Sequence, residues 1–148
     1  MNSVTAYLAL GSNQGDRVAN LRKACKLLEY HPEIKVEARS KIYETQSVEG
    51  GGVQDFLNAA VRIETTLSPV ALLAMIQAIE SAFGRLPEQK SRGGARAMDV
   101  DILLFGDLEV NEDDLTIPHP RALRRAFMIK PLADVLNDGW VRESKEEW

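Results

Sequence analysis

Two carboxylates on one short apolar segment are the feature of this chain that most clearly indicates chemistry. The segment Met98–Phe105 reads MDVDILLF, and side chains alternate between the two faces of a β-strand. As a strand it places Asp99 and Asp101 on one face, together with Leu103 and Phe105. Neighbouring acids need a positive partner, and an oxygen-only ligand set suits Mg²⁺. Solvation, or pairing with arginines upstream, is the alternative reading.

Basic side chains accumulate on both sides of these acids. They are Arg85, Lys90, Arg92, Arg96, His119, Arg121, Arg124 and Arg125. Arginine binds phosphate with two parallel hydrogen bonds. No phosphate-binding loop ending in Gly-Lys-Ser/Thr is present, so acids and arginines together indicate phosphoryl or nucleotidyl transfer, in which positioning and charge neutralisation supply most of the catalysis. His119, which precedes Pro120, fits either a turn or a hydrogen bond to a phosphate or ribose.

The composition narrows the class of protein. A chain of 148 residues with ordinary apolar content is most simply one domain, here 1–148. Its net charge of -4 argues against a nucleic-acid binder, including a sheet that binds RNA or DNA. The single cysteine, Cys25, lies in an apolar helical stripe and is interpreted as core rather than as a reactive thiol. No run is long enough to cross a membrane, and a cytoplasmic location is expected.

Periodicity and cap residues predict six main elements in the order strand, helix, strand, strand, helix, strand. They are a strand over 4–10, a helix from about Asp16 to Tyr30, strands over Ile34–Tyr43 and Gln54–Glu64, a helix from Ser68-Pro69 to Gly84, and the strand Met98–Phe105. This βαββαβ order is that of an α+β, ferredoxin-like fold, in which both helices cover one face of an antiparallel sheet.

Strand alternation divides the predicted sheet into two faces. The helix-covered face takes Leu57, Ala59, Val61, Val100, Ile102 and Leu104, and the open face takes Phe56, Asn58, Asp99 and Asp101. An aromatic ring, an amide and two acids on an uncovered face predict a binding site; a plain solvent-facing surface is the alternative. Residues 106–115 are expected as a hairpin or loop. One or two short helices broken at Pro131 follow, and the tail from about residue 138 is expected to fray.

Five ordered motifs resemble the 6-hydroxymethyl-7,8-dihydropterin pyrophosphokinase family. They are ALGSNQGDR near the start, YET at Tyr43–Thr45, FLNAAV at Phe56–Val61, RAMDVDILLF at Arg96–Phe105 and TIPHPRALRRAFMIKPL at Thr116–Leu132. The resemblance implies a ferredoxin-like fold and a monomeric enzyme that acts on two small molecules, with neither a nucleic acid nor a membrane as partner. It further implies transfer of pyrophosphate from ATP to the pterin hydroxymethyl group, with release of AMP.

The resemblance also implies site residues. Asp99 and Asp101 match the pair that holds two Mg²⁺ ions, with Arg85 and Arg96 beside them in catalysis. Thr45, Phe56, Asn58 and Phe127 match the pterin-binding positions, the two rings enclosing the pterin. The ATP-binding positions are Gln77, Glu80, Arg85, Arg96, Ile102, Thr116, His119 and Arg125.

The motif before the metal pair departs from the family pattern. Family members usually carry Arg-Trp-Gly-Pro-Arg before the metal pair, whereas Arg92–Arg96 reads RGGAR here. The two glycines predict a more mobile lid over the site and weaker exclusion of water. A module of the same fold that binds pterin or nucleotide but turns over poorly is therefore the second hypothesis.

Overall fold

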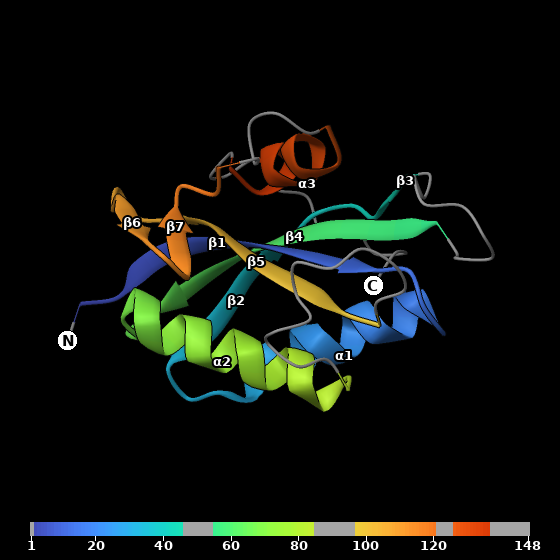
Figure 1. Ribbon diagram of the computed structural model, residues 1–148, viewed down its shortest axis with the longest axis horizontal. Coiled ribbons are helices and arrows are strands. Elements are labelled where there is room, and N and C mark those ends of the chain that lie inside the picture. Colours follow the sequence, from blue (N-terminus) through green and yellow to red (C-terminus); the bar gives the residue numbers. More distant parts are fainter. Residues whose placement is uncertain (1, 46–54, 85–96, 121–125, 137–148) are drawn as a thin grey trace.

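The computed structural model describes residues 2–45, 55–84, 97–120 and 126–136 (Figure 1). Along the chain the elements are β1 (Val4–Ser12), α1 (Arg17–Tyr30), β2 (Ile34–Arg39), β3 (Tyr43–Thr45), β4 (Phe56–Thr65), α2 (Pro69–Ala82), β5 (Asp99–Phe105), β6 (Val110–Glu112), β7 (Leu115–Ile117) and α3 (Ala126–Leu136). None of the helices within these ranges is long and apolar enough to cross a bilayer. The expected frayed tail lies outside the described residues.

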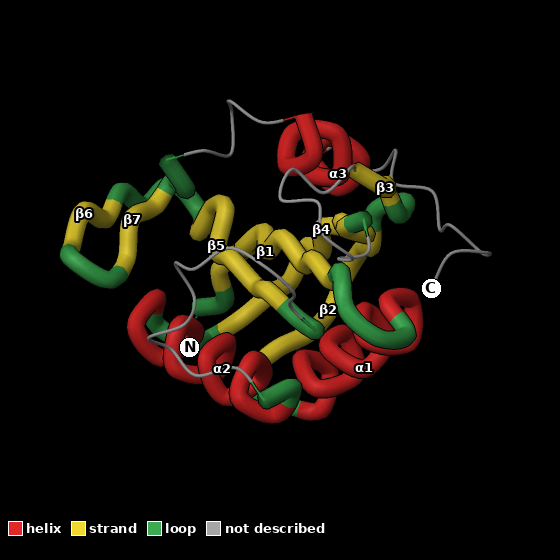
Figure 2. The backbone as a smooth tube through the Cα atoms, turned by 45° about the vertical axis from the view of Figure 1, so that its right-hand side comes forward, coloured by secondary structure: helices red, strands yellow, loops and turns green. Residues whose placement is uncertain are grey.

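The main sheet has the strand order β2-β4-β1-β5, with β3 added to β4, and every pair in it is antiparallel. Helices α1 and α2 cover one face, and α3 lies on the other (Figures 1 and 2). This order and layering are those of the ferredoxin-like fold. The predicted α+β class is therefore confirmed, because each of the six predicted elements has a counterpart in the structure, with some bounds changed, and the two helices share a face (Figure 1).

The two long helices begin where their cap residues predict. The Asp16 carboxylate accepts a hydrogen bond from the Ala19 N–H at 3.1 Å. The Ser68 hydroxyl accepts one from the Ala71 N–H at the same distance. Each bond satisfies an N–H that the first turn of a helix leaves without a helical acceptor. Gly84 follows α2 with φ +87°, a conformation that favours glycine.

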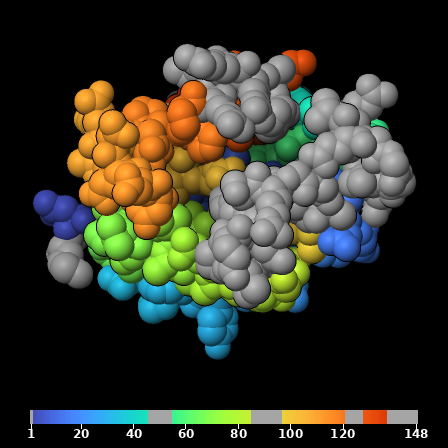
Figure 3. Space-filling model, viewed as in Figure 1, coloured from blue at the N-terminus to red at the C-terminus, as the bar shows by residue number. Residues whose placement is uncertain are grey.

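The main core fills the space between the sheet and helices α1 and α2. Its fully buried side chains include Leu8, Leu10, Leu21, Leu28, Ile63, Leu72, Ile76 and Val100. The β6–β7 hairpin, one of the two expectations for residues 106–115, adds Leu115 and Ile117 to this core. In the space-filling view its orange atoms lie beside the green atoms of α2 (Figure 3).

The prediction of one strand over Ile34–Tyr43 is wrong. Strand β2 ends at Arg39, and β3 begins at Tyr43. At Ser40 the side-chain hydroxyl accepts the Ala60 N–H at 2.8 Å, while the Ser40 N–H donates to the Ala60 carbonyl at 2.9 Å. A hydroxyl thus replaces a backbone carbonyl in the ladder. The chain leaves regular pairing there, although the alternation of side chains in the sequence continues.

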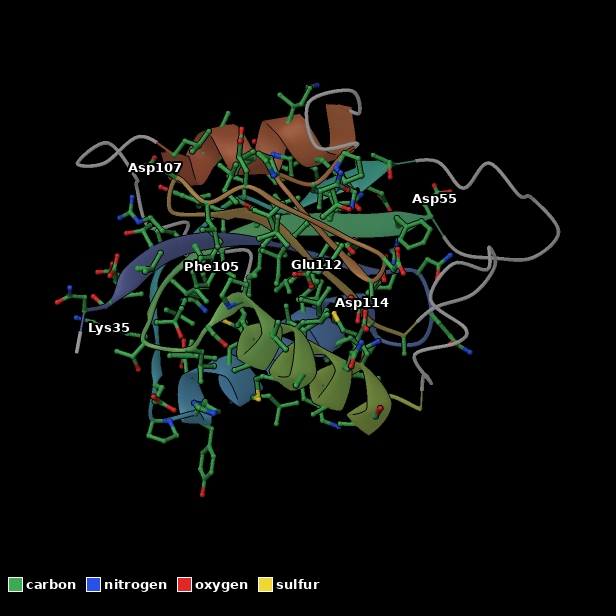
Figure 4. All side chains as sticks on the ribbon, turned by 60° about the vertical axis from the view of Figure 1, so that its left-hand side comes forward. Lys35, Asp55, Phe105, Asp107, Glu112 and Asp114 are labelled. Atoms are coloured by element: carbon green, nitrogen blue, oxygen red, sulfur yellow. The ribbon has the colours of Figure 1, made fainter. Side chains whose placement is uncertain are left out.

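The predicted faces of Leu104 and Phe105 are also wrong. The β1–β5 register shifts between Tyr7, which pairs with Leu104, and Leu8, which pairs with Ile102. This leaves Leu103 as an extra residue, as in a β-bulge. Beyond it the alternation is reversed, so Phe105 enters the main core (labelled in Figure 4) and Leu104 packs on the α3 side.

The expected break at Pro131 does not occur: α3 is one helix that continues through this residue, and it partly covers the face predicted to be open (Figure 1). Proline removes only the bond to the carbonyl of residue 127, near the helix start, and Pro131 is buried. A second cluster offsets that loss; it joins Met128, Leu132 and Val135 of α3 to Ala38, Ala60 and Leu103 of the sheet. The Asp134 carboxylate also accepts the Tyr43 hydroxyl at 2.7 Å.

Cys25 is expected to resist thiol reagents in the folded protein. Its side chain is buried in α1, and burial, followed by the nearby Glu29 carboxylate, raises the pKa of the thiol from 9.0 to about 12. The thiolate is the reactive form, so at pH 8 only about one molecule in ten thousand carries it. We expect no labelling by a disulfide reagent at pH 8, labelling that increases with pH, and complete labelling in urea. Rapid labelling of the native protein would contradict this burial.

Candidate functional site

Strand β1 separates the amide of β4 from the first acid of β5. Gly11 pairs with Asn58 on one side and with Asp99 on the other. Residues directly opposite each other on antiparallel strands share a face of the sheet. Asn58 and Asp99 therefore lie on the same face of the sheet, one on each side of Gly11, which has no side chain.

The second acid lies on the same face one step further along. Asp101 pairs with Ala9, which pairs in turn with Ala60. Ala9 and Ala60 both belong to the cluster under α3. Val100 and Ile102, by contrast, are buried in the main core. Both carboxylates therefore point away from α1 and α2, as the alternation predicts for this part of the strand.

His119 lies beside the second acid. Its backbone N–H donates to the Leu103 carbonyl at 3.0 Å, which holds the chain after β7 against β5. Its Nε2 is 3.9 Å from Asp101 Oδ1, and the two side chains are 18% and 21% exposed. That separation is longer than a hydrogen bond but short enough for electrostatic attraction when the imidazole is protonated. The two groups thus form one half-buried polar centre, which the reading of His119 as a simple turn residue does not explain.

An amide, a hydroxyl and an aromatic ring form the other half of the site. Asn58 is buried, and its Nδ2 donates to Thr45 Oγ1 at 2.9 Å. Phe56 pairs with Thr45 across β3 and β4. A Cβ built on Gly11 would lie 3.5 Å from Asn58 Oδ1 and 3.7 Å from Phe56 Cδ1. The side chains nearest the Cβ position of Gly11 are thus a hydrogen-bonding amide and an aromatic ring, a combination that suits a flat polar heterocycle.

The donor set of the two acids fits a hard cation. Asp99 and Asp101 stand about 7 Å apart along the strand, from the rise per residue. Among the described residues, no three His, Cys, Asp or Glu side chains gather as a closed metal cage. Two carboxylates alone leave most of an octahedral shell to water and phosphate oxygens, which is how Mg²⁺ is usually held. The pair therefore fits a magnesium ion that arrives with a phosphorylated ligand.

The other predicted nucleotide positions lie around β5. Glu80 is buried, and its Oε2 accepts the Val100 N–H at 2.9 Å, so this carboxylate braces the outer edge of β5. Gln77 lies one turn earlier on α2 and is half-buried. The Ile102 side chain is in the main core, which leaves only its backbone for a ligand. Thr116 is exposed on β7, three residues before His119.

Several predicted residues cannot be placed. Arg85, Arg96 and Arg125 lie outside the described residues, as do the two glycines of the predicted lid. Phe127 belongs to α3, but its side chain is not described. Their roles stay predictions.

The sequence reasoning missed the role of Gly11. The predicted strand over 4–10 stops before this glycine, whereas β1 continues to Ser12 and includes it. Alternation offered a signal: Ala9 and Gly11 are small residues on one face of a strand, which leaves room above that face. The sequence also carried no signal for the hydrogen bonds of Arg17, because their acceptors, Glu44 and Asp55, are distant from it in the chain.

Comparison with known proteins identifies related sequences over nearly the whole chain. The model of the 7,8-dihydro-6-hydroxymethylpterin-pyrophosphokinase family matches residues 7–137. A 2-amino-4-hydroxy-6-hydroxymethyldihydropteridine pyrophosphokinase of Bacillus subtilis is 45% identical over 91% of this chain and 79% of its own length. The protein of that name from Methylorubrum extorquens is 44% identical, over 90% of this chain and 83% of its own.

Other relatives are longer proteins. The bifunctional protein FolKE of Lactococcus lactis is 40% identical over 90% of this chain, which spans only 38% of that protein. The HPPK-DHPS crystal structure from Plasmodium falciparum aligns with a TM-score of 0.61 at 17% identity, over 85% of this chain and 38% of that one. At this identity the structural likeness supports the fold alone.

Proposed function

The chain belongs to the 7,8-dihydro-6-hydroxymethylpterin-pyrophosphokinase family, and we propose that it transfers pyrophosphate from ATP to the hydroxymethyl oxygen of 6-hydroxymethyl-7,8-dihydropterin, releasing AMP, in folate biosynthesis. The observation that carries the proposal is the register of β1. Gly11 pairs with both Asn58 and Asp99, so a heterocycle bound on one side of this glycine adjoins metal-binding acids on the other.

The polar groups of β3 and β4 orient the pterin. Asn58 and Thr45 offer hydrogen bonds to the amide-like edge of the ring, and the face of Phe56 stacks on it. Because Asn58 is buried and already bonded to Thr45, its amide is held in one orientation before the substrate arrives. A fixed amide lowers the entropic cost of placing the hydroxymethyl oxygen toward the phosphate. Phe127 is the second stacking ring in this proposal.

The acids select the form in which ATP binds. Asp99 and Asp101 lie on one face of β5 and repel a bare triphosphate, so only the magnesium complex is attracted; we propose two ions. Bound Mg²⁺ supplies charge neutralisation of the phosphate oxygens. His119, 3.9 Å from Asp101, is held where it can donate to a phosphate or a ribose hydroxyl. Arg85, Arg96 and Arg125 complete the proposed triphosphate contacts.

Measurement of AMP release tests the proposal. We expect AMP to appear only when the dihydropterin, ATP and Mg²⁺ are all present, and to be suppressed by a chelator. A 6-methyl-dihydropterin is the matched control substrate, because it keeps the ring edge but lacks the accepting hydroxyl. Pterin binding without AMP formation would instead support the impaired-module hypothesis, and absence of both would refute the proposal.

The proposal extends to the setting of the protein. We take it as a cytoplasmic monomer that acts on these two small molecules, with no nucleic acid or membrane as partner. The free thiol of Cys25 is compatible with a reducing compartment. Some relatives are much longer bifunctional proteins. The proposed activity and setting therefore refer to the domain that this chain forms.

A further inference from the structure

We propose that Arg17 is a positioning residue for the pterin pocket, holding β3 against the start of β4 so that Thr45 and Phe56 are correctly presented. This inference rests on the proposed function. It concerns the GSNQGDR motif, whose last residue is the first residue of α1.

One guanidinium nitrogen joins two distant segments to α1. Arg17 Nη1 donates to Glu44 Oε2 at 2.6 Å and to the Asp55 carbonyl at 2.7 Å. Glu44 is the central residue of β3, and Asp55 immediately precedes β4 (labelled in Figure 4). The arginine side chain is only 24% exposed. Its own position is stabilised because Asp16 caps the helix that carries it.

Strand β3 needs such support. It has three residues and pairs only with β4 among the main-sheet strands, and a short edge strand is held by few backbone hydrogen bonds. Two side chains attach it elsewhere. Tyr43 donates to Asp134 of α3, and Glu44 accepts from Arg17 of α1. The strand is thus tied to a helix on each side of the sheet.

The two contacts of Arg17 are next to the pocket residues. Glu44 adjoins Thr45, whose Oγ1 accepts the Asn58 amide. Asp55 adjoins Phe56, which pairs with Thr45 in the ladder. A shift of β3 along β4 would therefore move the hydroxyl away from the amide and change the position of the ring. Strand β5, which carries the two acids, pairs with β1 and not with β3. A shift of β3 should therefore have little effect on the binding of ATP.

The energetic contribution of this ion pair to the whole fold is expected to be small. Glu44 is 53% exposed, and exposed ion pairs are screened by solvent and contribute little to stability. Removal of Arg17 should therefore change the local geometry more than the unfolding temperature. This separates a positioning role from a merely structural one.

The experiment compares Arg17→Ala and Arg17→Lys with Arg22→Ala. Arg22 is exposed on the same helix, so its removal costs the same charge without the two contacts. For Arg17→Ala we expect the pterin KM to rise about tenfold, since misplaced binding groups cost one to two orders of magnitude, while the ATP KM and the unfolding temperature stay close to those of the Arg22→Ala protein. The pterin KM of Arg17→Lys should lie between those of the wild-type protein and Arg17→Ala, because an ammonium group can still reach one of the two acceptors.

A double-mutant cycle with Glu44→Ala completes the test. Residues that share one interaction show non-additive effects, so Glu44→Ala should add little in an Arg17→Ala background. Equal changes in both KM values, or identical behaviour of Arg17→Ala and Arg22→Ala, would overturn the inference. If the wild-type protein releases AMP and these variants show no such difference, only the inference fails. If the wild-type protein neither binds pterin nor releases AMP, the proposed function fails.

Discussion

Replacing Asp101 with asparagine is expected to lower kcat for AMP release by at least about 100-fold, the loss typical of removing one group that stabilises transition-state charge. Asparagine keeps the shape of the side chain but removes the charge that attracts Mg²⁺. Asp99→Ala should have a similar effect, since both acids stand on the same face of β5. Turnover at saturating MgATP, followed as AMP formation, measures the effect.

The fold should survive these changes. Both acids are partly exposed, and the buried clusters on the two faces of β5 do not include them, so the unfolding temperature should stay close to that of the wild-type protein. Asp114→Asn is the matched control, because it removes an exposed acid from the turn between β6 and β7 (labelled in Figure 4). Its kcat should equal that of the wild-type protein. Near-normal turnover in either Asp99→Ala or Asp101→Asn would remove the metal assignment.

A side chain at Gly11 is expected to weaken pterin binding in proportion to its size, with little effect on the affinity for ATP. A Cβ there lies in ordinary contact with Asn58 Oδ1 and Phe56 Cδ1, at 3.5 and 3.7 Å, so the protein can accommodate it. Gly11 is also not among the glycines with positive φ, and β-branched residues favour strands. Gly11→Val should therefore fold, yet its methyl groups would occupy the space in which the ring is proposed to bind.

A graded series makes this prediction sharp. Gly11→Ala should weaken pterin binding by about tenfold and Gly11→Val by about 100-fold or more, in line with the cost of forcing extra methyl groups into a fitted site. Calorimetry with the dihydropterin, in the presence of a non-hydrolysable ATP analogue, measures the pterin affinity. The affinity for the analogue alone is the internal control. Unchanged pterin binding in Gly11→Val would place the pocket elsewhere.

Local features of the sequence determined where the two long helices begin and the order of strands and helices along the chain. Asp16 and Ser68 mark helix starts because a side-chain acceptor for a first-turn N–H is needed within three residues. The alternation of side chains likewise depends on one strand alone, and it correctly predicted that Asp99 and Asp101 lie on the face away from α1 and α2. The βαββαβ order then left few possible topologies.

Only the tertiary structure decided how the two halves of the site meet. The interruption at Ser40, the extra residue Leu103 and the continuous α3 each depend on a partner in another element, such as the Ala60 N–H or the cluster beneath α3. Gly11 becomes the spacer between amide and acid because of pairing with strands about 50 and 90 residues away. Sequence periodicity encodes which way a side chain points; the residue that it faces is set by packing and register between distant segments.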